Sequence, residues 1–259
     1  MNRAAITLLV CAACGVAQPK FTAPLAGIVR DSRQQLRLVN AVSGTFILHD
    51  VVGGTAVDWA FDGNSGLVKT NAELLLIGAN GAVVARRSAQ QEAVLGPQSA
   101  FFPETHELWL AAANNVTKVP VEPAVIAGSV MALGPVSGRS VQLAVCRQNA
   151  LWLLSVDTTH GQVTQELALG GIIGEQACIA SGGGSLVLLA DRMLLATART
   201  LLVQTTAGLE RTIPISATHV TRAGQHWVEA ETPGGPAHMI QITSDGERAF
   251  QLPAAKELP

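Results

Sequence analysis

The chain has 259 residues, of which 48% are hydrophobic and only 14% are charged. This composition excludes a disordered protein, a collagen and a coiled coil, because each of these requires a bias or a charge content that is absent. A net charge of −2 provides no basic surface, so no nucleic-acid partner is expected. The length suits one large all-β domain or two smaller ones.

Residues 1–17 have the pattern of a secretory signal peptide. Arg3 precedes an apolar run over residues 4–14, which is too short to span a bilayer. Small residues at 15 and 17 favour cleavage before Gln18, and a lipid anchor at Cys14 or Cys11 is the alternative. We therefore predict a periplasmic or secreted mature domain over residues 18–259, without a transmembrane segment.

Cys146 and Cys178 are the two cysteines that remain after this cleavage. An oxidising compartment permits a disulfide between them. Both lie in apolar segments typical of strands, where a free buried thiol is equally natural. The sequence leaves both alternatives open and slightly favours free thiols.

A repeated unit is the clearest signal in the sequence. An apolar strand, a polar or glycine-containing turn and a more polar strand recur six times, which predicts six β-hairpins. The hairpins begin at residues 36, 74, 108, 151, 201 and 239. The mean period of about 40 residues is typical of propeller blades with four strands each.

Further predicted strands precede most hairpins and complete the blades. In the fifth unit these strands are 176–180 and 186–190, with 193–200 as an extra segment. The first unit contains a strand over 27–30 but lacks a clear innermost strand. Residues 21–25 either supply that strand or pair with the last blade to close the ring.

The third strands of the units are nearly continuous apolar runs, which indicates sheets buried on both faces. The sequence thus predicts an all-β fold, a β-propeller of about six four-stranded antiparallel blades in a single domain. A β-sandwich or a pair of small β-domains is the alternative, but neither explains six equivalent hairpins at one period.

One unit also resembles a known group of proteins. An apolar strand ends in the aromatic Phe61, and a turn containing Asp62 and Gly63 follows. A second hairpin turns at Asn80-Gly81. Over residues 56–87 this unit resembles one blade of the TolB, YVTN and WD40-like propellers. The resemblance implies the architecture and assigns no functional residue.

Motifs of catalysis and cofactor binding are not found in the sequence. It contains no sialidase-type Asp box, no Gly-x-Ser-x-Gly elbow, no His-Glu-x-x-His and no P-loop. His219, His226 and His238 fall in one predicted blade, but their spacing matches no standard zinc pattern. We therefore predict no catalytic residue, no metal and no cofactor.

Two aromatic residues beside a predicted turn, Phe101 and Phe102, precede His106. Packing between blades is the first interpretation of these residues, and a partner-binding patch is the alternative. The function predicted from the sequence is a monomeric, non-catalytic, extracytoplasmic binding or scaffolding propeller, whose partner is a protein or an envelope component. The alternatives are a hydrolase or lyase with carboxylates or histidines at the central channel, and a component of envelope assembly.

Overall fold

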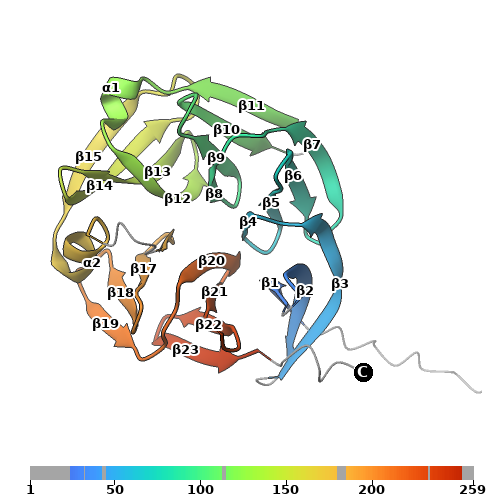
Figure 1. Ribbon diagram of the computed structural model, residues 1–259. Helices are drawn as coiled ribbons and strands as arrows, with labels where there is room; N and C mark the ends of the chain where they lie inside the picture. Colours follow the sequence, from blue (N-terminus) through green and yellow to red (C-terminus); the bar gives the residue numbers. More distant parts are fainter. Residues whose placement is uncertain are drawn as a thin grey trace, which may run out of the picture.

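The computed structural model is a ring of six antiparallel sheets around a central channel (Figure 1). It describes residues 24–31, 33–42, 45–112, 115–179, 185–232 and 234–252. The predicted signal peptide lies outside these residues. The predicted all-β propeller of six blades is confirmed.

Each blade is built from strands that are consecutive in the chain and hydrogen-bonded to one another in that order. Blades 1 to 3 contain β1 (Leu25–Arg30), β2 (Gln35–Val42), β3 (Thr45–Thr55); β4 (Asp58–Phe61), β5 (Ser65–Lys69), β6 (Glu73–Gly78), β7 (Val83–Ser88); and β8 (Val94–Gly96), β9 (Ser99–Phe102), β10 (Glu107–Ala112), β11 (Asn115–Pro120). Blades 4 to 6 contain β12 (Ser129–Ser137), β13 (Ser140–Arg147), β14 (Ala150–Asp157), β15 (Val163–Leu169); β16 (Leu186–Leu188), β17 (Arg192–Ala196), β18 (Leu201–Thr205), β19 (Glu210–Ile213); and β20 (His219–Gly224), β21 (Trp227–Glu231), β22 (His238–Thr243), β23 (Gly246–Gln251).

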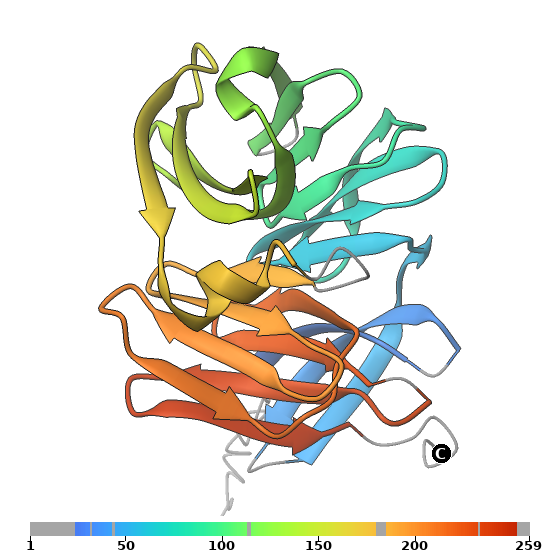
Figure 2. The ribbon, with the colours of Figure 1, turned by 60° about the vertical axis from the view of Figure 1, so that its left-hand side comes forward.

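Two short helices lie in the connections between blades. Helix α1 (Pro123–Ile126) joins blade 3 to blade 4, and α2 (Gly171–Gln176) joins blade 4 to blade 5. Figure 2 shows the twist within the blades, which is pronounced in β12–β15. Within the described residues, neither helix has the length and hydropathy that a membrane span requires.

The core lies between neighbouring blades. The third strand β6 is buried along almost its whole length, whereas the outer strand β7 is largely exposed. The same contrast separates β18 from β19. Apolar side chains from adjacent blades form six clusters around the ring. The apolar third strands and polar outer strands predicted from the sequence are confirmed.

The strands of blade 5 differ from the prediction. The segment 176–178 is not a strand: Gln176 ends α2, and Ala177 packs beside that helix in an apolar cluster. The innermost strand is β16, and β17 occupies the segment that we had taken as extra. The apolar run around Ala177 is buried by helix packing, which its sequence does not distinguish from strand packing.

Blade 1 has three strands in the described part of the chain, because no innermost strand precedes β1. The inner strand β20 of blade 6 packs directly against β1 instead. A Cβ atom at Gly27 would lie 1.8 Å from the carbonyl oxygen of Ala223, and one at Gly224 would lie 2.0 Å from that of Ala26. Only glycine permits this approach of two backbones. Leu25 lies in β1 and pairs with Asn40, and the rest of segment 21–25 except Pro24 lies outside the described residues.

Cys146 and Cys178 are joined by a disulfide, with their Cα atoms 5.5 Å apart. The slight preference for free thiols was therefore wrong. Cys146 lies on β13 of blade 4, and Cys178 follows α2. Because α2 folds back onto blade 4, it brings the second cysteine to the first, a contact between distant segments that residue types alone do not reveal.

We expect Cys146→Ser/Cys178→Ser to lower the free energy of unfolding by about 3–4 kcal/mol, because the bond closes a loop with a sequence separation of 32. Urea unfolding of both proteins measures the difference. Wild-type protein treated with reductant should match the double variant, and equal stability with and without the bond would contradict the assignment.

Candidate functional site

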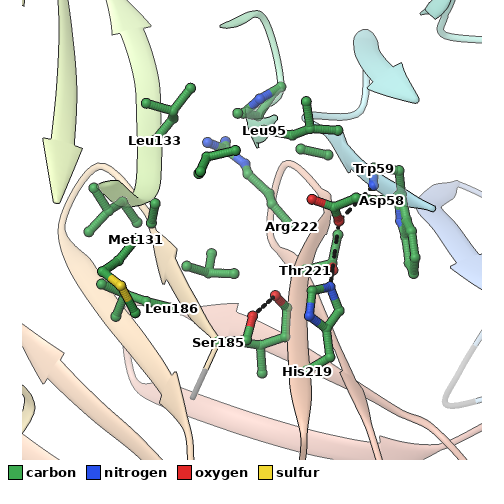
Figure 3. A pocket seen from close by; sticks show the side chains of 18 of the residues that line it. Asp58, Trp59, Leu95, Met131, Leu133, Ser185, Leu186, His219, Thr221 and Arg222 are labelled. Carbon is green, nitrogen blue, oxygen red and sulfur yellow. Dashed lines mark hydrogen bonds and ion pairs between the residues drawn. The ribbon is translucent and has the colours of Figure 1, made fainter. Parts of the chain in front are cut away.

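The channel contains a cavity of about 170 Å³ lined by the inner strands of blades 2 to 6. Its wall has two chemically different halves (Figure 3). Leu95, Met131, Leu133 and Leu186, from β8, β12 and β16, form an apolar half. The polar half comes mainly from β4 and β20, with Asp58, His219, Thr221 and Arg222.

None of the described residues of blade 1 lines this cavity, and the polar half comes from the two blades on either side of it. Strands β4 and β20 belong to blades 2 and 6, yet they contact each other directly. His219 Nε2 therefore lies 3.5 Å from Asp58 Oδ1, and both side chains are half-buried. A complete first blade would place a strand between them.

Arg30 fills part of the gap between blades 6 and 2. Its guanidinium donates to the backbone carbonyl of Val57 at 3.0 Å and lies 3.6 Å from a carboxylate oxygen of Glu231. It also lies over the ring of Trp59, 4.5 Å from the centroid. Because Val57 precedes Asp58, Arg30 holds the start of β4 in place beside β20.

The contacts of His219 differ from those of the histidine in a nucleophilic triad. The Nε2 atom that faces Asp58 is also 2.8 Å from the hydroxyl of Thr221. In a nucleophilic triad the hydroxyl and the carboxylate contact different ring nitrogens, so that the imidazole transfers a proton between them. Here one nitrogen serves both groups. Ser185, the other hydroxyl of the cavity, donates to the carbonyl of Val220 at 3.0 Å.

Arg222 extends from β20 into the channel, towards Leu95 (Figure 3). Its Nε and Nη1 atoms are buried and have no hydrogen-bond partner among the described residues. Burial lowers the pKa of Arg222, and the negative charge of Asp62 opposes that change. A guanidinium nevertheless stays protonated in proteins, so the channel holds a positive charge.

Glu229 is the fully buried acid of the described chain, and it lies outside the channel cavity. Its side chain, on β21, is 0% exposed. Both carboxylate oxygens accept from the backbone N–H of Arg30 at 3.1 Å, which gives that group of β1 a partner in blade 6. Burial and the nearby Glu231 raise the pKa of Glu229 well above its usual range. Its position assigns it to closing the ring rather than to a reaction at the channel.

The residues singled out from the sequence lie away from the channel. Phe101 and Phe102 are each 1% exposed and pack on opposite faces of β9, towards blades 4 and 2. Both side chains therefore pack between blades, and a partner-binding role stays a prediction. His106 is half-buried and lines a rim groove that also contains Glu122 and His160.

The three histidines of blade 6 are dispersed. His219 faces the channel, His226 lies in the exposed β20–β21 turn, and His238 begins β22 beside Thr232. Burial lowers the pKa of His238. In the part of the chain that the structure describes, no three His, Cys, Asp or Glu side chains are grouped to hold a metal.

No family model matches the sequence, and neither does the sequence of any curated protein. Among solved structures, a protein of unknown function from Bacteroides caccae has 11% identity and a TM-score of 0.51, with 91% of this chain and 96% of that one covered. The β-propeller domain of Cps50 (Swd1) from Myceliophteria thermophila has 13% identity and a TM-score of 0.47, with 90% and 88% covered. At 11% identity, the likeness to the Bacteroides caccae protein concerns the fold alone.

We expect Glu229→Gln to remove a decline of stability with pH. A carboxyl whose pKa is raised by folding stabilises the fold below its unfolded pKa of about 4.3, and this contribution is lost as pH rises towards the folded pKa. Across that window, wild-type protein should lose up to about 1.4 kcal/mol per pH unit more than the variant. Urea unfolding at a series of pH values measures both slopes.

The exposed Glu92→Gln is the matched control and should keep the wild-type slope. If Glu229→Gln and wild type lost stability in parallel with rising pH, Glu229 would be ionised in the folded protein and the assignment would be wrong.

Proposed function

We propose that this protein is an extracytoplasmic, monomeric and non-catalytic binding propeller that holds its partner at the channel mouth formed by Asp58, Ser185 and His219. The observation that carries the proposal is the cavity itself. Polar groups on β4 and β20 face an apolar wall, which is the combination found in binding pockets. Propeller folds serve as scaffolds for partners, and we infer that the partner is a protein or an envelope component.

Two features support the extracytoplasmic location. Residues 1–17 have the composition of a signal peptide. Cys146 and Cys178 are bonded, and stable disulfides are typical of proteins outside the reducing cytosol.

The non-catalytic part of the proposal rests on His219. Its Nε2 atom faces both Asp58 and Thr221, so the ring does not connect a hydroxyl to a carboxylate. The acid with the strongly raised pKa, Glu229, is buried outside the cavity. A hydrolase or lyase remains the second candidate, because a carboxylate and an imidazole 3.5 Å apart beside a cavity are able to exchange a proton.

The partner should depend on the polar mouth. We expect Asp58→Asn/His219→Gln to weaken partner binding about tenfold or more, since it removes hydrogen bonds to charged groups while keeping side-chain size. Immobilised mature protein is incubated with an envelope extract, and the bound proteins are quantified by mass spectrometry.

Asp245→Asn/His226→Gln is the matched control, because both residues are exposed in turns of the same blade. Proteins retained equally by all three forms would contradict binding at this mouth. Turnover of polysaccharides or lactones by wild type that Asp58→Asn abolishes would replace the binding proposal by the enzymatic one.

Export makes a separate prediction. The chain expressed with its own leader should be recovered outside the cytoplasm with Gln18 as its first residue, as N-terminal sequencing would show. A first residue of lipid-modified Cys14 or Cys11 would contradict release, and recovery of the intact chain in the cytoplasm would contradict export.

A further inference from the structure

Arg222 differs from three other largely buried arginines, each of which is paired with an acid. Arg192 is paired with Asp191 and Glu247, and Arg37 is paired with Asp31 at 2.6 Å. Arg147 donates to the carbonyl of Ile126 and is paired with Glu166. These pairs follow the rule that a charge removed from water needs a partner. Among the described residues, nothing accepts a hydrogen bond from Nε or Nη1 of Arg222.

The acid whose charge acts on Arg222, Asp62, forms no ion pair with it. The charge of Asp62 acts on it from the β4–β5 turn, yet no ion pair joins the two side chains. One carboxylate oxygen of Asp62 accepts from the backbone N–H groups of Asn64 and Ser65, and the other accepts from the side-chain amide of Gln98. Asp62 is thus engaged in its own turn and with blade 3.

The surroundings of Arg222 indicate which kind of ligand would pair with its positive charge. The side chain lines the cavity, so the cavity is the place where an acceptor would meet the guanidinium. Facing it are Leu95, Leu133 and Leu186, which offer no side-chain acceptor. The cavity volume is about 170 Å³. This is larger than one water molecule, which takes about 30 Å³, and smaller than the sites of drug-sized ligands, which take about 300–1,000 Å³.

We infer that Arg222 is the anion-binding residue of the channel and that its ligand is a small monocarboxylic acid with a short apolar group. The carboxylate pairs with the guanidinium, a geometry in which two parallel hydrogen bonds form. The apolar group packs on the leucine wall. A monocarboxylate fits better than phosphate because Asp58 places a negative charge on the same cavity wall. The inference rests on the proposed function insofar as the channel is a binding site.

The test uses isovalerate, isovaleramide and inorganic phosphate as probes at about pH 7, where isovalerate is ionised. The mature protein is titrated with each by calorimetry, and its melting temperature is followed in parallel. Isovalerate should bind and raise the melting temperature, because a ligand that binds only the folded state stabilises it. Isovaleramide has the same shape without the charge, and phosphate has the charge without the apolar group.

Arg222→Gln and Arg222→Met should bind isovalerate about tenfold more weakly or worse. Arg248→Gln, at an exposed arginine of blade 6, is the matched control and should bind like wild type. Without ligand, Arg222→Met should melt at or above the wild-type temperature, because it removes a charged group with two buried nitrogen atoms that have no partner among the described residues.

Several outcomes would overturn the inference: no binding of isovalerate, equal binding of isovaleramide, equal binding of phosphate, or unchanged binding by Arg222→Met. The partner-capture experiment shows whether a failure concerns this ligand or the proposed function. If Arg222→Met retains the protein partner while isovalerate fails to bind wild type, the ligand class is wrong and the scaffold proposal stands. If isovalerate binds but no protein depends on Asp58 and His219, the carboxylate site stands alone.

Discussion

Sheets with two apolar faces are the constraint on which this structure depends. The inner strands carry apolar side chains on both faces, so a single blade leaves one face exposed wherever it lacks a neighbour. A closed ring covers every face, and each of the six apolar clusters draws its residues from adjacent blades or the helices between them. The outer strands then meet water and are polar, as β7 and β19 show.

Closure is the demanding step in such a ring, and here it does not use a strand shared by the first and last blades within the described chain. Blade 6 instead meets blade 1 through three kinds of contact. Gly27 and Gly224 let the two backbones touch, Phe46 and Trp227 pack edge to face with ring centroids 5.7 Å apart, and Glu229 accepts from the β1 backbone. The buried carboxyl supplies the acceptor that a neighbouring strand supplies elsewhere, which explains its place in an apolar interface.

Hairpin periodicity was sufficient to predict the ring, because alternating turns and apolar strands are local properties of the sequence. It was insufficient where burial came from another element. The segment around Ala177 is apolar because a helix packs there, and Cys178 reaches Cys146 only through that helix. The candidate site was not predicted, since Asp58 and Arg222 come from blades 2 and 6. The one usable signal was the absence of a clear innermost strand in the first unit, which we had related to closure and not to the channel.

That absence links the fold to the candidate site. Among the described residues, no strand of blade 1 lies at the channel, β20 contacts β4, and polar side chains of both strands line one cavity. Arg30 and Glu229 connect blade 1 to its neighbours. Arg30 donates a hydrogen bond to the carbonyl of Val57, and Glu229 accepts one from the backbone of β1. Asp58 and His219 also connect blades 2 and 6, with 3.5 Å between Oδ1 and Nε2, whereas Nε and Nη1 of Arg222 have no hydrogen-bond partner among the described residues. For Arg222, whose buried nitrogen atoms lack partners beside a cavity, a binding role is the simplest physical explanation.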